Sequence, residues 1–200
     1  MPGKGACLPS LQLCWSIPAG MHRAPLLALL DAYQPLDAAD AACRDRFIAF
    51  VRQYVDCFER ALAIGHVTGS AWVVDATGGR VLLTHHRKLD CWLQPGGHAD
   101  GDPDVAAVAL REACEETGLA GLTREGSGVF DLDIHPIPAR GDIAEHEHFD
   151  VRFVVRAGDE RFVVSDESHD LAWVPLDELE RYTIEWSVLR MREKWRRLTA

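Results

Sequence analysis

The residues best suited to chemistry in this chain are three glutamates in one short run, Glu112, Glu115 and Glu116. Positions i, i+3 and i+4 share one face of a helix, with side chains within about 6 Å of one another. Three carboxylates this close repel each other unless a cation lies among them. Carboxylate oxygens suit Mg²⁺ or Mn²⁺, and such an ion can bind phosphate oxygens, orient a water and neutralise charge at phosphorus. The spacing therefore indicates metal-assisted phosphoryl chemistry, and an acidic helix face exposed to solvent is the alternative.

A glycine pair comes shortly before this run. Gly96-Gly97 allows the backbone to bend sharply and to bring its carbonyl groups close to a ligand. We expect Asp102 to cap the following helix, Pro103 to be its first residue, and Gly118 to end it. The sequence thus predicts a ligand-binding loop followed directly by the carboxylate-bearing helix.

The segment from Gly97 to Leu119 resembles the Nudix box, which reads glycine, five residues, glutamate, seven residues, and then R-E-apolar-x-E-E-x-G-apolar. The positions that match this pattern are Gly97, Arg111, Glu112, Ala113, Glu115, Glu116, Gly118 and Leu119. The first glutamate of the pattern falls on Pro103, which alters the expected metal set but not the expected fold. Asp100, Asp102 and Asp104 are the candidates to replace the lost carboxylate in part.

The resemblance implies an enzyme that hydrolyses a diphosphate linkage in a nucleotide or another organic diphosphate, with Mg²⁺ or Mn²⁺ as cofactor. It implies that Glu112, Glu115 and Glu116 bind the metal, together with the carbonyl of Gly96. Arg111, Glu112 and Glu115 are the implied catalytic residues, and the identity of the general base stays open. Arg111 can pair with Glu115 one turn further on, or with a carboxylate of the loop.

A histidine and two basic residues near the glycine pair are candidate substrate contacts. His98 lies within the loop itself, and Arg87 and Lys88 follow a strand-like segment just before it. In Nudix proteins this last region can reach the diphosphate. A simple loop hydrogen bond for His98 and a surface turn for the basic pair are the alternatives.

Two later segments alternate apolar and polar residues in the manner of strands. Their polar positions are Asp131, Asp133 and His135 in one, and His146, His148, Asp150 and Arg152 in the other. If the two segments pair, they form one face rich in His and Asp, on which His146 and His148 are candidate substrate contacts. The alternatives for this face are a second metal site, a solvated sheet face, and structural hydrogen bonds.

The elements that position these residues alternate between strand and helix patterns. Strands are predicted for 67–75, 80–86, 129–136, 146–155 and 171–176, and helices for 103–117 and 184–198. The order predicts an α/β fold, a Nudix-like mixed-sheet α/β/α sandwich, with residues 63–200 as the Nudix hydrolase domain. We expect two charged groups near the C-terminus to be solvated surface, namely the acidic Asp166, Glu167 and Asp170 and the basic Arg190, Arg192, Lys194, Arg196 and Arg197. For the acidic group, a loop that lends one metal ligand is the alternative.

The N-terminal third has a different pattern. Apolar residues at three- and four-residue spacing predict helices from about Pro25 and over 38–62, which form a helical extension over residues 21–62. Residues 1–20 contain a single charged residue, and prolines interrupt their apolar stretch. We expect this segment to be flexible, or to result from a start placed upstream of Met21, and to be dispensable.

The composition narrows the classes of partner. The net charge of -10 argues against nucleic acid, because a phosphate backbone needs cationic side chains. Six cysteines without a C-x-x-C pair are typical of reduced thiols, so we expect a cytoplasmic protein. The small-molecule diphosphate substrate is what the resemblance to the Nudix box implies. No apolar run has the length of a membrane helix. A homodimer is compatible with the sequence.

Two other functions stay open. The isopentenyl-diphosphate isomerase branch uses a Nudix-like fold with a reactive cysteine and a histidine-rich metal site, for which Cys91 and His98 are candidates. A non-catalytic ligand sensor is expected to lose core carboxylates, and Pro103 is its only support. The intact R-E-x-x-E-E core favours hydrolysis over both.

Overall fold

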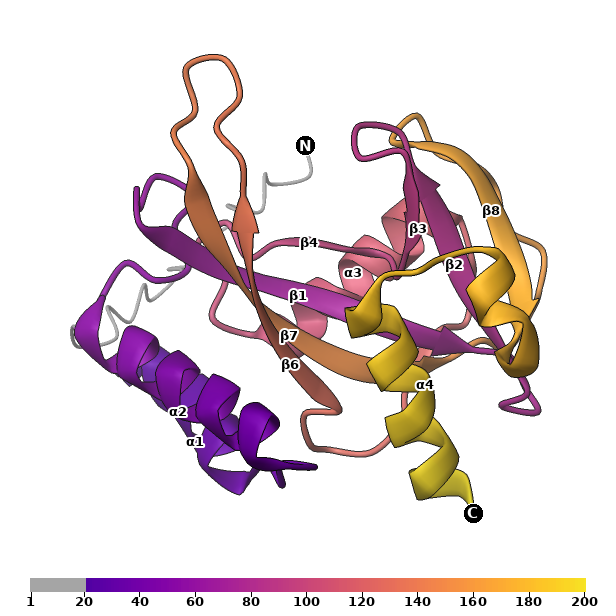
Figure 1. Ribbon diagram of the computed structural model, residues 1–200, viewed down its shortest axis with the longest axis horizontal. Coiled ribbons are helices and arrows are strands. Elements are labelled where there is room, and N and C mark those ends of the chain that lie inside the picture. Colours follow the sequence, from indigo (N-terminus) through magenta and orange to yellow (C-terminus); the bar gives the residue numbers. More distant parts are fainter. Residues whose placement is uncertain (1–20) are drawn as a thin grey trace, which may run out of the picture.

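A mixed β-sheet between helices forms the centre of the protein in the computed structural model, which describes residues 21–200 (Figure 1). The elements in chain order are η1 (Met21–Arg23), α1 (Ala24–Ala32), α2 (Ala38–Gln53), β1 (Gly65–Val74), β2 (Arg80–His86), β3 (Cys91–Leu93), β4 (Gly96–His98), α3 (Val105–Thr117), β5 (Thr123–Arg124), β6 (Asp131–Ile137), β7 (His146–Arg156), β8 (Ser168–Pro175), η2 (Leu176–Arg181) and α4 (Trp186–Thr199).

Strands β1 and β7 lie side by side at the centre of the sheet and run parallel, paired from Gly65↔Glu147 to Val74↔Arg156. β4 pairs antiparallel with β1, whereas β5 and β6 pair antiparallel with β7. β2 pairs antiparallel with β1, β3 and β8. Both strand directions therefore occur in one sheet, which confirms the predicted mixed topology.

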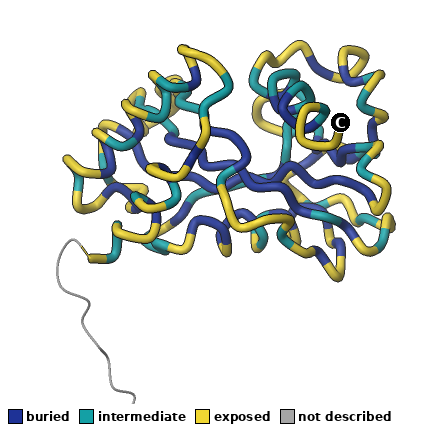
Figure 2. Tube along the Cα trace, turned by 90° about the horizontal axis from the view of Figure 1, so that it is seen from below, coloured by how far each residue is buried: buried dark blue, intermediate teal, exposed yellow. Residues whose placement is uncertain are grey.

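Helices cover both faces of this sheet, because successive side chains of β1 point to opposite sides. Ala71 and Val73 pack against α3 through Ala113, whereas Trp72 and Val74 share a second cluster with α4. Figure 1 shows α4 in front of the sheet and α3 behind it. Buried residues follow the strands and the inner sides of the helices (Figure 2). The α/β/α sandwich predicted from the sequence is confirmed.

The N-terminal helices share an apolar cluster with the sheet. The ring of Phe50 stacks on Phe149 of β7 with centroids 3.7 Å apart, and Phe47 meets the same ring edge-on at 5.4 Å. Helix α2 ends at Gln53, so the prediction that it extends to residue 62 is wrong. The chain instead reverses into the sheet, and the carbonyl of Cys57 accepts the N–H of Val67 at 2.8 Å.

The predicted division of the chain at residue 62 stays a prediction, and the segment 1–20 lies outside the described residues. Within residues 21–200 no helix has the length and apolarity needed to cross a membrane.

Candidate active site

Helix α3, which carries the three glutamates, begins two residues later than predicted, at Val105. Asp104 is its N-cap, and its Oδ1 accepts the N–H of Ala107 at 3.1 Å. The carboxylate of Asp102 accepts a hydrogen bond from the N–H of Asp104 at 2.9 Å, so Asp102 forms a turn before the helix and does not cap it. Pro103 lies between the two, outside the helix. The predicted end is confirmed, because Gly118 has a left-handed conformation (φ 65°) in which other residues are strained.

The glycine pair brings β4 into close contact with α3. The N–H of Gly96 donates to Oε1 of Glu116 at 3.0 Å. A Cβ atom on Gly97 would lie 2.4 Å from Oε2 of Glu112, and a Cβ on Gly96 would lie 2.2 Å from Oγ of Ser70. Any larger residue would push the strand away from these partners. The two glycines therefore seat Glu112 and Glu116 against the loop backbone.

Glu112 and Glu116 are carboxylates with little access to water. Glu116 is 7% exposed, and the side chain of Glu112 is 19% exposed. Burial raises the pKa of Glu116 to about 8, with further increases from the charges of Glu167 and Glu112. Burial also raises the pKa of Glu112, against the opposing effect of Arg111. A divalent cation would relieve both effects, and the hard oxygen donors fit Mg²⁺ or Mn²⁺. Glu115 lies exposed on the same helix, and its role as a ligand stays a prediction.

Arg111 pairs with its neighbour in the chain. Its Nη2 lies 3.0 Å from Oε1 of Glu112 and donates to the carbonyl of His98 at 3.4 Å. Nη1 lies 3.9 Å from Oδ2 of Asp102. Of the two partners expected from the sequence, the loop carboxylate is thus the one within reach of Arg111.

The three loop aspartates have separate structural tasks. Asp100 accepts two hydrogen bonds from Arg60, at 2.8 and 2.6 Å. Asp104 caps α3. Asp102 is the one that approaches Arg111, and it therefore comes nearest to the task expected of the missing box glutamate.

The basic pair lies on the connection from β2 to β3. Arg87 donates to the carbonyl of Ser168 at 2.9 Å, and its N–H bonds the carbonyl of Glu167 at 3.0 Å. Lys88 is exposed. This connection thus holds the loop that carries Glu167, whose charge acts on both box carboxylates. The sequence favours ordinary surface for Glu167, with a loop that lends one metal ligand as the alternative, because one acidic residue in an acidic loop gives no clear signal before the tertiary fold is known.

The two alternating segments, β6 and β7, do pair, with Asp133 opposite Asp150 and His135 opposite His148. At one end of the shared face five imidazoles gather, with ring centroids 4.9 to 5.5 Å apart: His66, His98, His135, His146 and His148. Burial lowers the pKa of His66 to about 4 and that of His148 to about 2. The sequence analysis missed His66, which reaches the cluster through the parallel pairing of β1 with β7.

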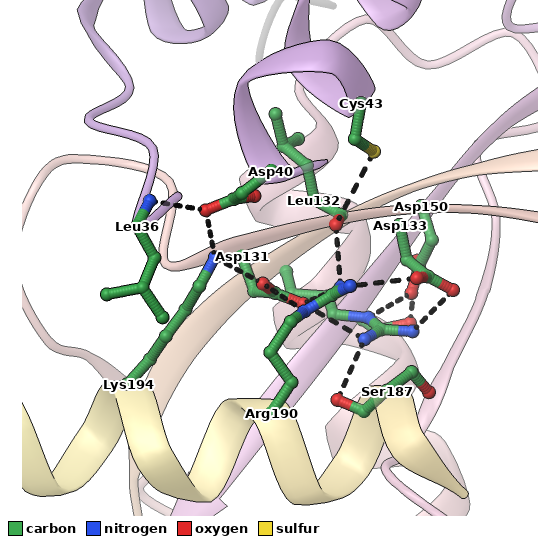
Figure 3. A network of polar contacts seen from close by, with 12 residues as sticks. Leu36, Asp40, Cys43, Asp131, Leu132, Asp133, Asp150, Ser187, Arg190 and Lys194 are labelled. Atoms are coloured by element: carbon green, nitrogen blue, oxygen red, sulfur yellow. Dashed lines mark hydrogen bonds and ion pairs between the residues drawn. The ribbon is translucent and has the colours of Figure 1, made fainter. Parts of the chain in front are cut away.

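The other end of this face is an ion network closed off from solvent (Figure 3). Arg152 is 1% exposed, and its guanidinium bonds Asp131, Asp133 and Asp150 at 3.0, 3.2 and 2.7 Å. Of the alternatives for this face, structural hydrogen bonds apply at this end.

Two basic residues of α4 close the same network. Arg190 and Lys194 both bond Asp131, at 2.7 and 2.6 Å, and Lys194 also bonds Asp40 at 2.7 Å. The expectation that the basic residues of α4 are all solvated is therefore wrong. Positions 190 and 194 are one turn apart and face the sheet, where buried carboxylates require positive charge.

Comparison with known proteins agrees with this geometry. A family model described as NUDIX domain matches residues 66–194. The chain is 41% identical over 49 residues to nucleoside diphosphate-linked moiety X motif 6 of Xenopus laevis, a match that covers 24% of this chain and 23% of that protein. The fold is similar to a C. elegans Ap4A hydrolase in a binary complex (TM-score 0.54, 16% identity, 66% of this chain and 96% of that chain). It is also similar to the MutT protein of Methanosarcina mazei (TM-score 0.52, 18% identity, 69% and 97%).

The family model covers well over half of the chain and includes the glycine loop, the carboxylate helix and every strand of the sheet. This chain belongs to the NUDIX domain family.

Proposed function

We propose that this chain hydrolyses the diphosphate linkage of a nucleotide or a related organic diphosphate with the help of Mg²⁺ or Mn²⁺. Glu112, Glu115, Glu116 and the carbonyl of Gly96 are the proposed ligands. The observation that supports this most is the environment of Glu116. Its side chain is buried, yet among residues 21–200 it has only the N–H of Gly96 as a hydrogen-bond partner. A buried carboxylate with so little compensation suits a cation site.

The bound ion supplies charge neutralisation at the diphosphate and a polarised water. The protein's own residues hold the ligands in place. Gly96 bonds Oε1 of Glu116 and Arg111 bonds Oε1 of Glu112, which leaves both Oε2 atoms for other partners. Arg111, Glu112 and Glu115 are the proposed catalytic residues.

The substrate is proposed to approach from the side of the β2–β3 connection. Arg87 and Lys88 bring positive charge to this side, next to the loop of Glu167. His98 completes the proposed contacts, whereas His146 and His148, which the sequence predicts as contacts, lie in the histidine cluster. We also propose that the substrate is a small molecule and the protein is cytoplasmic; light scattering on the purified chain tests the proposed homodimer.

The isomerase alternative requires a reactive thiol. Cys91 lies on β3, in the lining of a cavity of about 380 Å³ beside the η2–α4 connection, and burial raises the pKa of its thiol. A reactive cysteine needs the opposite shift. The sensor alternative needs lost carboxylates, whereas Glu112, Glu115 and Glu116 are all present. Hydrolysis is the function that these residues favour.

A panel of diphosphate compounds tests the proposal. It includes Ap4A, because one similar fold is that of an Ap4A hydrolase, nucleoside diphosphates linked to a further group, nucleoside triphosphates and diphosphates without a nucleoside. We expect Mg²⁺-dependent release of phosphorylated products from at least one class. If every compound reacts no faster than with the Glu112→Gln/Glu116→Gln double variant, the proposal is wrong.

A further inference from the structure

We propose that the histidine cluster binds a transition-metal ion of the Zn²⁺ class, at a site separate from the carboxylate site of the box helix. His66, His146 and His148 each offer one ring nitrogen, and these three atoms all lie within 4.8 Å of one another. A tetrahedral Zn²⁺ with bonds of about 2.1 Å holds its nitrogen ligands roughly 3.4 Å apart. Small side-chain rotations are enough to close the remaining gap.

The strand pairing sets this arrangement. His66 and His148 are direct partners across the parallel β1–β7 pair, and His146 lies two residues earlier on the same face of β7. Two of the three ligands thus come from one strand and the third from its neighbour, near the N-terminal ends of the two central strands of the sheet. A site on such elements is held in place before any ion arrives.

Unpaired nitrogen atoms point to a missing partner. His66 is 2% exposed, and within residues 21–200 neither of its ring nitrogens has a hydrogen-bond partner. Nε2 of His148 is likewise buried and unpaired among these residues. Buried polar atoms are rarely left without a partner. An ion that accepts one lone pair from each ring accounts for one nitrogen of His66 and for Nε2 of His148.

Hydrogen bonds around the cluster fix the protonated nitrogen and the orientation of its rings, as is usual for metal-binding histidines. Nδ1 of His146 lies 2.9 Å from the carbonyl of Ala144, so this nitrogen must carry the proton and leave Nε2 free for an ion. His135, a ring of the cluster that is not among the three proposed ligands, bonds Oδ2 of Asp133 through its Nδ1 at 2.9 Å. Carbonyl and carboxylate partners of this kind orient the imidazoles around an ion.

The donor set selects the type of ion. Neutral imidazoles suit Zn²⁺, Co²⁺, Ni²⁺ and Cu²⁺, whereas Mg²⁺ prefers the carboxylate oxygens of Glu112 and Glu116. Residue 98 contacts both the histidine cluster and the box helix. The ring of His98 lies 4.9 Å from the rings of both His66 and His148, and its carbonyl accepts from Arg111. His98 is therefore the nearest candidate for a fourth ligand, and an ion here would anchor the box loop.

Direct binding tests this proposal without reference to turnover. The full chain is stripped with a chelator, dialysed, and titrated by calorimetry with Zn²⁺ in the presence of excess Mg²⁺. A parallel titration with Co²⁺ is followed by visible absorption. We expect one Zn²⁺ per chain, and Co²⁺ bands typical of nitrogen ligands.

Variants then assign the ligands. His66→Gln, His146→Gln and His148→Gln should each weaken Zn²⁺ binding at least tenfold. His146 and His148 are less buried than His66, so His146→Gln decides the matter if His66→Gln fails to fold. The matched control is His169→Gln, an exposed histidine whose ring contacts His85 outside the cluster. Glu116→Gln should leave Zn²⁺ binding unchanged. The proposal is overturned if the parent binds no stoichiometric Zn²⁺, or if Glu116→Gln abolishes binding while His146→Gln does not.

Discussion

The backbone N–H of Gly96 donates a 3.0 Å hydrogen bond to Oε1 of Glu116, across the interface between β4 and α3. The first glycine of the box loop and the most buried carboxylate of the box helix thus form one unit. Glutamine at position 116 can still accept this bond but carries no charge. The two contributions of Glu116, to packing and to metal binding, can therefore be separated.

Glu116→Gln should lower turnover by orders of magnitude, because it removes one charged ligand from a tight cluster. The free energy of unfolding should change much less, since size and the bond to Gly96 are kept. Steady-state kinetics over a Mg²⁺ series, with thermal unfolding of the same samples, measures both. The control is Glu178→Gln on η2, whose carboxylate pairs with Arg181 at the surface. Near-normal turnover of Glu116→Gln at saturating Mg²⁺ would remove this residue from the site.

Gly97→Ala tests the close approach of the loop to Glu112. The new Cβ would lie 2.4 Å from Oε2 of Glu112, so either the carboxylate or the strand must move. We expect activity to fall at least tenfold, because a ligand is displaced. Gly128→Ala is the matched control, since a Cβ there meets no atom within 4 Å. Equal activity of the two variants would show that the position of Glu112 does not limit the reaction.

The box was predictable because its information is local. Spacings of three and four residues place Glu112, Glu115 and Glu116 on one helix face whatever surrounds them. Alternation likewise predicted β6 and β7, and their antiparallel pairing brings His135 opposite His148. The fold class followed from the order of these elements.

His66 and Lys194 show what local patterns leave out. His66 joins the histidine cluster because β1 pairs in parallel with β7, about 80 residues further along the chain. Lys194 is a basic residue on an amphipathic helix, for which exposure is the usual outcome. It is buried because Asp40 and Asp131, from two distant elements, converge on it. Both placements depend on tertiary partners that no single segment specifies.

Lys194→Met should destabilise the protein by about 3–5 kcal/mol, because it leaves the buried charge of Asp40 without its cationic partner and removes one of the three cations around Asp131. Arg197→Met, an exposed change of the same kind on the same helix, should cost less than about 0.5 kcal/mol. Urea unfolding curves give both values. Similar midpoints for the two variants would mean that Arg152 and Arg190 balance the network alone.

The same network predicts a loss of stability in acid. Burial acts to raise the pKa of Asp40, but hydrogen bonds from Lys194, the N–H of Leu36 and Tyr33 hold it below its ordinary value of 3.8. A carboxyl group whose pKa is lower in the folded than in the unfolded state stabilises the fold at any pH above its unfolded-state pKa. This contribution is lost as the pH falls through the folded-state pKa. As the pH is lowered below about 4, the free energy of unfolding should therefore fall more steeply in the parent than in Asp40→Asn. Parallel slopes in urea titrations would contradict this.

Pro103→Glu restores the residue type of the family pattern, yet we expect it to bring little gain in activity at limiting Mg²⁺. Pro103 precedes the N-cap of α3 and lines a cavity of about 220 Å³ with Pro25, Leu26 and Leu29 of α1. The side chain of a glutamate at position 103 would leave the backbone among these apolar residues.

Asp102 already lies 3.9 Å from Arg111, so the support for the box arginine is present in another form. Asp102→Asn should accordingly raise the Mg²⁺ concentration for half-maximal activity several-fold. Asp100→Asn should raise it less, because Arg60 occupies that carboxylate with two hydrogen bonds. Mg²⁺ titrations of the three variants distinguish the cases. A marked gain for Pro103→Glu, with no loss for Asp102→Asn, would mean that the natural site is short of one ligand and that Asp102 does not compensate.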